Sequence, residues 1–315
     1  MKIVYMGTPD FAVPPLAALV KNGYEVAAVV TQPDKPKGRG KTLLPTPVKE
    51  EAMKHEIPVY QPLKVRDSEF VETLKELAPD MIIVAAFGQI IPKTILDMPK
   101  YGCLNIHASL LPKYRGAAPI QQAVIDGEKE SGVTIMKMGV GLDTGDMISQ
   151  AVVPLAEDET GGSLFDKLAE EGAELLIRTI PSIVAGTAVY TKQPEESPTP
   201  YAAMISKKMG LMDFTKSATE LERLVRGMNP WPSAYTFLNG KTLKVWKCSV
   251  ESGNCGKEAP GTITGVDKKG IHVACGTDKL VLEEVQLEGK KRMETDAFLR
   301  GYQVTEGIML KDHKE

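Results

Sequence analysis

The sequence predicts an α/β fold, with a Rossmann-like, doubly wound and mostly parallel sheet followed by a small β-barrel. In the first half of the chain, strand-like apolar segments alternate with helix-like segments, which is the order that parallel strands and crossover helices produce. From residue 235 onward, short strand-like segments follow one another, several of them separated by Gly or Asn-Gly turns. That spacing is typical of a small barrel.

The expected elements of the first half run from residue 3 to residue 185. Segment 81–87 is continuously apolar, as expected of a parallel strand that is covered on both faces. Asp67 is placed to act as the N-cap of the amphipathic helix that follows it. We expect strands at 3–6, 25–31, 58–60, 81–87, 101–106, 133–138 and 147–155. We expect helices at 14–22, 46–55, 67–77, 119–125 and 163–185.

A proline-rich segment separates the two halves. Residues 191–201 combine Pro194, Pro198 and Pro200 with acidic and hydroxyl side chains, which is the composition of a linker. Beyond this segment we expect a helix at 218–226 and strands at 235–237, 243–246, 261–263, 271–274 and 280–282. The expected domains are therefore 1–189 and 206–315, joined by a linker at 190–205.

Composition sets the size of the molecule and the nature of its surface. The chain has 315 residues with 43% hydrophobic content, which is enough for two domains with separate cores. The net charge of −3 does not by itself indicate nucleic-acid binding. From Ser206 onward, however, there are 18 Lys and Arg against 15 Asp and Glu, or +3, while the rest of the chain carries −6. The C-terminal part is therefore the more basic one.

The cysteines and the apolar runs predict a cytoplasmic protein. The four cysteines are Cys103, Cys248, Cys255 and Cys275. No pair has the Cys-x-x-Cys spacing of a zinc or redox site, so we expect reduced thiols and no metal. The N-terminal apolar run is too short for a signal peptide, and segment 81–87 is too short to span a bilayer. We expect no membrane partner and a monomer.

An amide, an imidazole and a carboxylate mark the candidate active site. Asn105 and His107 end an apolar strand and are two residues apart, so their side chains point to the same face. Asp143 lies in the loop between two later strands. Such groups can polarise a carbonyl, hold its oxyanion and move a proton, which is the equipment for acyl transfer between amines. The alternative is that Asn105 and His107 only cap a turn.

Two other classes of site are poorly supported by these residues. A nicotinamide site would need a Gly-x-Gly-x-x-Gly turn after the first strand, and the chain has Gly7-Thr8-Pro9 there. A serine nucleophile would need a Gly-x-Ser-x-Gly elbow, which is missing. One His, one Asp and one Asn also make a thin ligand set for a metal ion.

The motif Asn105-x-His107-x-Ser109-Leu110-Leu111-Pro112 with the later Asp143 resembles the folate-dependent formyltransferase superfamily. Further segments are similar to the members of that superfamily that act on methionyl-tRNA. These segments are 7–12, 32–40, 109–121, 132–136, 139–146 and 229–232. The resemblance covers nearly the whole chain, and the three candidate catalytic positions follow the family pattern.

The resemblance implies a reaction and a domain plan. It implies transfer of the formyl group of 10-formyltetrahydrofolate to the α-amine of methionyl-initiator tRNA, by a catalytic domain that precedes an OB-like tRNA-binding barrel. Asn105 and protonated His107 would stabilise the oxyanion, and Asp143 would orient His107 or a water; whether His107 or Asp143 is the formal base stays open. A formyltransferase for a small amine, such as glycinamide ribonucleotide or an amino sugar nucleotide, and a non-catalytic tRNA-binding protein are the alternatives.

Two short segments are candidates for folate binding. Ser109, Leu110, Leu111 and Pro112 offer a hydroxyl, apolar side chains and a rigid bend directly after the catalytic strand. The neighbouring apolar strand ends at Phe87, Gly88 and Gln89. A pterin ring needs a flat apolar slot with a few amide-like partners, which backbone groups of these segments and of the loop near Asp143 can supply. The alternative is that Leu110 and Leu111 are ordinary core.

A basic loop is the candidate for RNA binding. Lys35, Lys37, Arg39 and Lys41 place four cations within seven residues, between a strand and a helix. Cations contribute most where they neutralise phosphates, and the resemblance implies that this loop reaches the acceptor end of initiator tRNA, with Arg39 as its key residue. The alternative is a purely solvated loop. Lysines of the barrel are weaker candidates for phosphate contacts.

Overall fold

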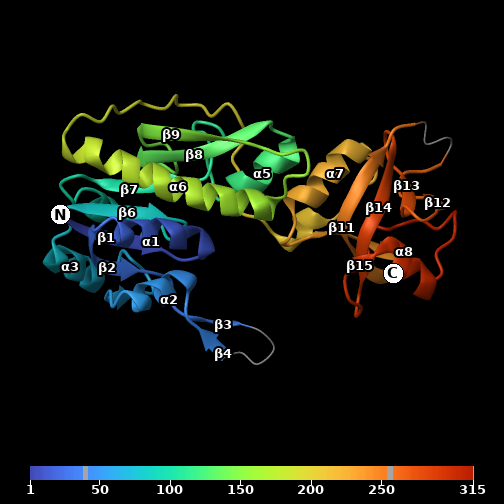
Figure 1. Cartoon of the computed structure of the whole chain (residues 1–315), viewed down its shortest axis with the longest axis horizontal. Helices are drawn as coiled ribbons and strands as arrows, with labels where there is room; N and C mark the ends of the chain where they lie inside the picture. Colours follow the sequence, from blue (N-terminus) through green and yellow to red (C-terminus); the bar gives the residue numbers. More distant parts are fainter. Residues whose placement is uncertain (38–41, 254–257, 315) are drawn as a thin grey trace. The chain divides into compact units, whose positions relative to one another are not determined.

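The computed structural model describes residues 1–37, 42–253 and 258–314, which fold into two compact units. The N-terminal unit comprises residues 1–119, 130–154 and 165–202. The C-terminal unit comprises residues 120–129, 155–164 and 203–315. Figure 1 shows a layered α/β arrangement in the first unit and an antiparallel sheet with short helices in the second.

The N-terminal unit is built on a seven-stranded sheet in the order β5-β2-β1-β6-β7-β8-β9. Neighbours from β5 to β7 pair in parallel, whereas β8 and β9 pair antiparallel. The strands are β1 (Lys2–Gly7), β2 (Glu25–Val30), β5 (Val59–Tyr60), β6 (Met81–Ala85), β7 (Cys103–His107), β8 (Glu130–Lys137) and β9 (Met147–Pro154). This is the predicted doubly wound and mostly parallel sheet.

Helices cover both faces of this sheet. The helices of this unit are α1 (Val13–Lys21), α2 (Pro47–Lys54), α3 (Ser68–Leu77), α4 (Lys93–Leu96) and most of α6 (Gly161–Val184). α5 (Pro119–Asp126), which follows β7 in the chain, belongs to the C-terminal unit except for its first residue. On one face, Val4 and Ile82 pack with Leu74 of α3 and Ile95 of α4 in a buried cluster. On the other, Gly172 of α6 fits closely against neighbours on β7 and β8, and the helix runs across the sheet in Figure 1.

The C-terminal unit is an antiparallel sheet in the order β10-β11-β14-β13-β12, with β15 added beside β14. Its elements are α7 (Ala218–Gly227), β10 (Ala234–Leu238), β11 (Lys241–Glu251), β12 (Ile263–Val266), β13 (Ile271–Ala274), β14 (Lys279–Leu287), β15 (Met293–Glu294) and α8 (Thr295–Gly301). The last segment pairs with both edges, because Lys311 bridges Phe237 of β10 and Met309 bridges Thr262 just before β12. This segment thus closes the sheet into the expected small barrel.

Several elements differ from the sequence expectation. The basic segment expected as a loop forms a hairpin on either side of residues 38–41, with β3 (Lys35–Lys37) pairing antiparallel with β4 (Thr42–Leu44). Pro36 is compatible with this two-stranded sheet, because both strands have a free edge. β11 and β14 are longer than expected, and α4, α8, β15, η1 (Asp10–Ala12) and η2 (Lys207–Gly210) were not expected. Asp67 occupies the N-cap position of α3, but its side chain makes no capping bond.

The proline-rich segment expected as a linker packs onto the N-terminal unit. Its residues as far as Ala202 belong to that unit. Ala202 accepts bonds from the N–H groups of Ala117 and Ala118, and its own N–H donates to the carbonyl of Arg115. The boundaries at 189/190 and 205/206 stay predictions. None of the described helices is long and apolar enough to cross a bilayer.

Candidate active site

Asn105 and His107 lie at the carboxyl end of β7. In the sheet register, Asn105 pairs with Val84 of β6 and His107 with Thr134 of β8. β6 ends at Ala85 and β7 at His107, and open α/β sheets generally bind their ligands at the carboxyl ends of such strands. Asn105 is half-buried, and the side chain of His107 is only 6% exposed.

Asp143 reaches His107 from the loop between β8 and β9. Its Oδ1 lies 3.8 Å from Nδ1 of His107, and its Oδ2 accepts a bond of 2.9 Å from the backbone N–H of Gly116. Asp143 has a φ of +51°, which a non-glycine residue rarely adopts. The structure therefore brings the predicted imidazole and carboxylate together, in a loop conformation that carries local strain.

The hydrogen bond on the far nitrogen fixes the role of the imidazole. Nε2 of His107 lies 3.0 Å from the carbonyl oxygen of Tyr114, which can only accept, so Nε2 carries a proton. Nδ1 is then the nitrogen that faces Asp143 at 3.8 Å, beyond hydrogen-bond length. This leaves Nδ1 and the carboxylate able to exchange a proton with a reactant near both.

Polar side chains of β8 and β9 hold the loop that follows His107. Oγ1 of Thr134 donates to the carbonyl of Ser109 and accepts from the N–H of Leu111. The amide nitrogen of Gln150 donates to the carbonyl of Leu111 at 2.8 Å and lies 3.0 Å from Oγ1 of Thr134. The turn at 109–111 is therefore fixed to the sheet beside the catalytic strand.

A buried clamp behind Asp143 was missed by the sequence reasoning. The side-chain amide nitrogen of Gln193 donates to the carbonyls of Asp143 and Gly145, at 2.9 and 2.7 Å. Its oxygen accepts from Nε of Arg115 at 3.0 Å, and the same guanidinium donates to two carbonyls of the 194–195 backbone. Gln193 and Arg115 are 5% and 7% exposed. The segment predicted as a linker thus positions the loop that carries Asp143.

An exposed aromatic ring also borders the site. The ring of Tyr201 lies so close to Gly116 that a Cβ on that glycine would be 2.8 Å from it. Gly116 is the residue whose N–H holds Asp143. Desolvation, and then the charge of Asp143, raise the pKa of Tyr201 above its usual value. No sequence pattern indicated a role for Tyr201, because this residue ends the proline-rich segment that was expected to be a linker.

The predicted folate-binding residues divide into two groups. The Ser109 hydroxyl is fully buried and donates to the carbonyl of Lys113, and Leu111 is also buried. Gln89 uses its side chain to hold the backbone of 62–65. Phe87 is buried as well. The other candidates are half-buried, as Leu110 and Pro112 are, or exposed, as Gly88 is. Folate binding by these segments stays a prediction.

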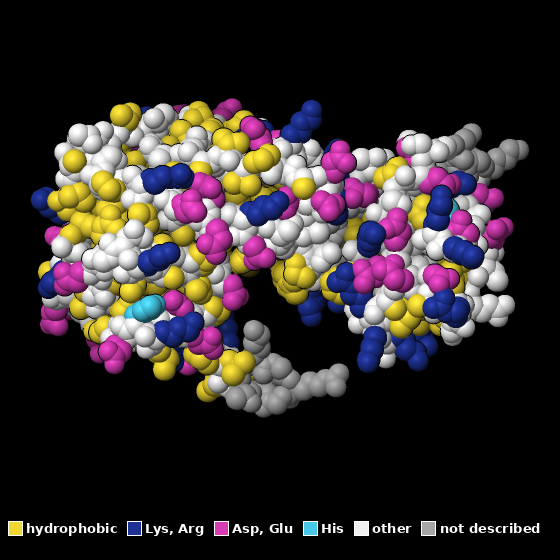
Figure 2. Space-filling model, in the orientation of Figure 1, with side chains coloured by type: hydrophobic (Ala, Val, Ile, Leu, Met, Phe, Trp, Pro, Cys, Tyr) yellow, Lys and Arg dark blue, Asp and Glu magenta, His cyan; other side chains and the backbone are white. Residues whose placement is uncertain are grey.

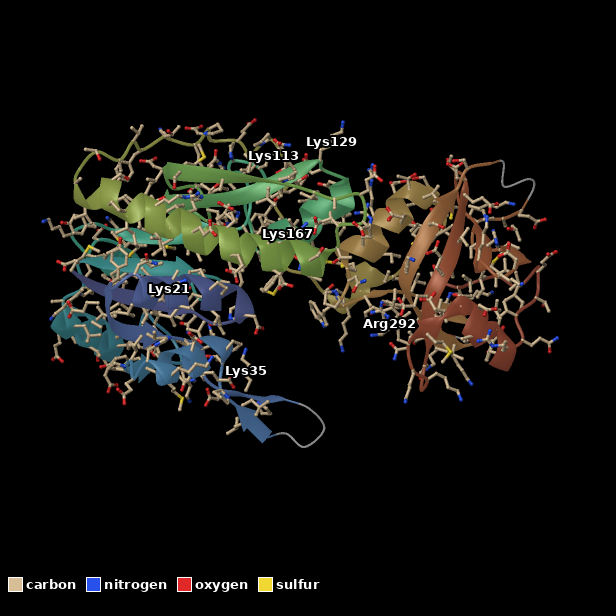
Figure 3. The ribbon with its side chains drawn as sticks, viewed as in Figure 1. Lys21, Lys35, Lys113, Lys129, Lys167 and Arg292 are labelled. Atoms are coloured by element: carbon tan, nitrogen blue, oxygen red, sulfur yellow. The ribbon has the colours of Figure 1, made fainter. Side chains whose placement is uncertain are left out.

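Two of the predicted RNA-binding residues, Lys35 and Lys37, lie on β3. Lys35 is exposed and leads into the hairpin, as Figure 3 shows. Lys37 ends β3. Arg39 and Lys41 lie outside the described residues.

The C-terminal unit has its own group of cations. Figure 2 shows Lys and Arg side chains gathered on its surface. Lys244 and Arg292 approach the ring of Trp246, at 5.6 and 4.6 Å from its centroid. A bidentate contact with Glu284 neutralises Arg292 in part. Among the described residues, no group of three or more His, Cys, Asp or Glu side chains is arranged to hold a metal ion.

Comparison with known proteins identifies the family. The family model described as formyl transferase matches residues 1–180, and that of the formyl transferase C-terminal domain matches 204–303. The methionyl-tRNA formyltransferase of Agathobacter rectalis is 59% identical, with 98% of each chain covered. The protein of the same name from Lachnospira eligens is 54% identical, over 98% of this chain and 99% of that one. The chain belongs to the formyl transferase family, within the group of methionyl-tRNA formyltransferases.

Solved structures support the same fold at much lower identity. An N-formyltransferase from Helicobacter canadensis, in complex with folinic acid and dTDP-3-aminofucose, is 21% identical with a TM-score of 0.65, covering 90% of this chain and 99% of that chain. HypX from Aquifex aeolicus, in complex with tetrahydrofolic acid, is 17% identical with a TM-score of 0.63, covering 100% of this chain and 51% of that one. These likenesses show the fold.

Proposed function

We propose that this enzyme transfers the formyl group from N10 of 10-formyltetrahydrofolate to the α-amino group of methionyl-initiator tRNA, and so supplies the initiator of translation. The observation that carries the chemistry is the buried pair of His107 Nδ1 and Asp143 Oδ1 at the open edge of the sheet. The likeness to methionyl-tRNA formyltransferases over nearly the full chain supports the acceptor.

The reaction is direct acyl transfer between two amines. The neutral α-amine attacks the formyl carbon, and a C–N bond forms while the carbonyl oxygen becomes an oxyanion. The amide of Asn105 and protonated Nδ1 of His107 donate to that oxyanion. The bond between the formyl carbon and N10 then breaks, and the proton lost by the attacking amine passes to N10.

Asp143 and His107 together carry the proton between the two amines. The carboxylate faces the same nitrogen that supports the oxyanion, so it can accept the ammonium proton and return it to the leaving nitrogen. Because the two groups lie so close, either could be the formal base, and the choice between them stays open.

The proposed function also assigns residues to the donor and acceptor sites and leads to an expectation about the assembly. Segments 87–89 and 109–112 border the folate pocket, while Lys35, Lys37, Arg39 and Lys41 meet phosphates of the acceptor stem. A single copy carries every residue proposed for catalysis, so we expect a monomer. We also expect a cytoplasmic protein.

The test is formyl transfer from 10-formyltetrahydrofolate to methionyl-initiator tRNA, methionyl-elongator tRNA and glycinamide ribonucleotide. Transfer to the initiator tRNA alone is the expected result. Transfer to the small amine instead would keep the chemistry and overturn the acceptor. Asn105→Ala should lower turnover by about 10²–10³-fold while the protein stays folded, since it removes one oxyanion donor. Near-wild-type turnover would remove Asn105 from the mechanism.

The hairpin assignment has its own test. Arg39→Ala should raise the KM for methionyl-initiator tRNA and leave the KM for the folate unchanged. A rise in the folate KM alone would show that this segment serves the donor and not the RNA.

A further inference from the structure

The backbone around Tyr201, at the end of the proline-rich segment, is fixed by hydrogen bonds on both sides of this residue. Two positions before it, the hydroxyl of Thr199 accepts from the N–H of Tyr114 at 2.7 Å. One position after it, the N–H of Ala202 donates to the carbonyl of Arg115 at 2.8 Å. The direction in which the Tyr201 side chain leaves the chain is therefore set before any ligand binds.

The loop that fixes Tyr201 also holds the two groups proposed to move protons. The carbonyl of Tyr114 accepts from Nε2 of His107 at 3.0 Å. The N–H of Gly116 donates to Oδ2 of Asp143 at 2.9 Å. One stretch of backbone thus positions the imidazole, the carboxylate and the aromatic ring together.

The hydroxyl end of the Tyr201 ring is the part that reaches this loop. A Cβ on Gly116 would lie 2.8 Å from Cε2 of Tyr201 and 2.9 Å from Cζ, the carbon that carries the hydroxyl. Gly116 also has a φ of +127°, so glycine is required here both for its backbone and for the room it leaves. Burial raises the pKa of Tyr201, and the charge of Asp143 raises it further. The ring therefore lies within the field of that carboxylate.

The ring of Tyr201 differs from two other tyrosine rings of the same unit. Lys137 lies 5.7 Å from the ring centroid of Tyr190, and Lys100 lies 4.9 Å from that of Tyr101. Tyr201 is 51% exposed, and no Lys or Arg among the described residues lies over its ring. An open aromatic ring beside a carboxylate is the composition of a site for an ammonium ion.

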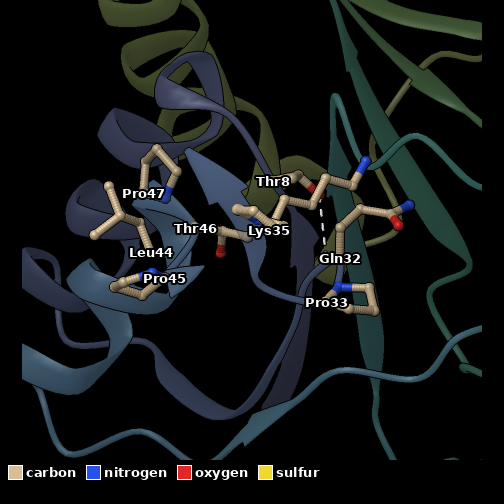
Figure 4. Close-up of a pocket in the computed structure, with 9 residues that line it drawn as sticks. Thr8, Gln32, Pro33, Lys35, Leu44, Pro45, Thr46 and Pro47 are labelled. Atoms are coloured by element: carbon tan, nitrogen blue, oxygen red, sulfur yellow. Dashed lines mark hydrogen bonds between the residues drawn. The ribbon is translucent and has the colours of Figure 1, made fainter. Parts of the chain in front are cut away.

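This ring takes no part in the cavity at the base of the β3–β4 hairpin. The described residues that line that cavity all lie between Thr8 and Pro47, and Figure 4 shows Thr8 and Gln32 among them. Thr8 follows β1 and Gln32 follows β2, whereas Tyr201 meets the loop that follows β7. The ring therefore borders the reacting groups and not that cavity.

The acceptor of the proposed reaction brings a cation to this place. An α-amino group has a pKa of roughly 7.7–8.0, so at neutral pH most of the acceptor carries an ammonium ion. Only the neutral amine can attack the formyl carbon, so the enzyme must bind the ammonium ion and then take its proton. The face of an aromatic ring attracts a cation by about 5- to 30-fold in affinity, and this attraction is absent for an uncharged group.

We propose that the ring of Tyr201 binds the α-ammonium group of the aminoacyl acceptor beside Asp143. The ammonium nitrogen lies between the ring and the carboxylate, and its proton passes to Asp143 before the neutral amine attacks. The inference rests on the proposed function, because it names the residue that recognises the amine of the acceptor. The attraction comes from the ring, so the phenol hydroxyl is not needed for it.

Substitutions at two tyrosines separate the ring from the hydroxyl and from general effects on the segment. Tyr201→Phe keeps the ring, and Tyr201→Leu replaces it by an aliphatic side chain. Tyr190→Leu is the matched control, because Tyr190 is 41% exposed directly before the same segment and its ring already has Lys137 beside it. Thermal unfolding of the three variants should give Tm values close to that of the wild type.

The experiment measures equilibrium binding of two initiator tRNAs without folate, at about pH 6.5, which is below the usual pKa of the amine. One tRNA is esterified to methionine, and the other to the 2-hydroxy analogue of methionine, which has nearly the same size and no charge. The wild-type enzyme should bind the methionyl form more tightly. Tyr201→Leu should reduce that preference by about 5- to 30-fold, while Tyr201→Phe and Tyr190→Leu should keep it.

Three results would overturn the proposal. The first is a wild-type enzyme that binds the two esters equally. The second is a full preference for the methionyl form in Tyr201→Leu. The third is an equal loss of preference in Tyr201→Phe or in Tyr190→Leu, which would assign the effect to the hydroxyl or to the segment as a whole.

Formyl transfer assays separate this inference from the proposed function. Tyr201→Leu should raise the KM for methionyl-initiator tRNA by about 5- to 30-fold, lower kcat by a smaller factor and leave the folate KM unchanged. A normal KM for the tRNA in Tyr201→Leu, with transfer to the tRNA intact, would overturn the role of the ring alone. Absence of any transfer to the tRNA by the wild-type enzyme would overturn the function, while the binding of the two esters still decides the role of the ring.

Discussion

Two buried histidines, one in each unit, lie close to carboxylates in different ways. His272 on β13 has a carboxylate at each ring nitrogen, with Glu251 3.0 Å from Nδ1 and Asp267 3.1 Å from Nε2. His107 has a backbone carbonyl at Nε2 and keeps Nδ1 3.8 Å from its single carboxylate, Asp143. Each nitrogen of the first ring thus lies close to a carboxylate, although its buried Nε2 has no hydrogen-bond partner among the described residues. Nδ1 of the second ring lies beyond hydrogen-bond length of its carboxylate.

The two histidines differ in what holds the carboxylate beside each of them. His272 joins strands β13 and β11 and the turn before β13, so its contacts stabilise the barrel. The carboxylate near His107 is held by partners other than the imidazole, namely the N–H of Gly116 and the clamp of Gln193 on the same loop. A carboxylate held in this way can face the imidazole without being bonded to it. The arrangement at His107 therefore depends on the residues that hold Asp143, namely Gly116 and Gln193.

The largest effect should come from replacing each of the two histidines by alanine and comparing the two variants. His107→Ala should lower formyl transfer by about 10²–10⁴-fold, because it removes a proton carrier and an oxyanion donor. His272→Ala should keep turnover near the wild-type value and lower the stability of the barrel by about 0.5–3 kcal/mol, the usual range for one substitution. Turnover and thermal unfolding, measured on both variants, give the comparison. A strong loss of turnover in folded His272→Ala would break it.

The bonds from Gln193 to the loop of Asp143 predict the next largest effect. Gln193→Glu keeps the oxygen that Arg115 needs and loses the donor to the carbonyls of Asp143 and Gly145. We expect kcat to fall roughly 10- to 100-fold, since small displacements of a catalytic group have large effects on rate. The KM for methionyl-tRNA should change little.

The matched control for this change is the exposed neighbour Lys192→Ala, which should behave as the wild type. A variant that lost only stability, with an unchanged kcat, would reduce Gln193 to a purely structural residue.

Local pattern explains which features were predictable. A strand was expected at 81–87, because a continuous apolar run is typical of a parallel strand, and the observed strand covers 81–85. Asn105 and His107 were noticed because two polar residues, two positions apart, end such a strand. The structure places Asp143 3.8 Å from His107. The roles of these three residues stay predictions.

Features that depend on distant contacts were not predictable in this way. Gln193 meets the backbone of Asp143 across 50 positions, and the prolines around it favoured the interpretation as a linker. From the sequence alone, Arg115 would be taken for a surface cation. In the structure its guanidinium donates to backbone carbonyls of the 194–195 segment. The hairpin of β3 and β4 was missed because Pro36 argues against a strand, although an edge strand tolerates it.

The smallest effect concerns the pH dependence of the barrel. The contact with His272, and then the N–H groups of Lys269 and Gly270, lower the pKa of Asp267. A carboxylate with a lowered folded pKa stabilises the fold above its unfolded pKa of about 3.9, and loses that contribution as the pH falls through the folded value. Asp267→Asn should therefore lower Tm slightly at pH 7, and the difference from the wild type should vanish in acid below that pKa. Thermal unfolding from pH 7 down to pH 2.5 measures this, with formyl transfer at pH 7 unchanged. A Tm difference that persisted or grew in acid would show that Asp267 acts through packing and not through its charge, and the contrast between the engaged His272 and the poised His107 would then rest on Glu251 alone.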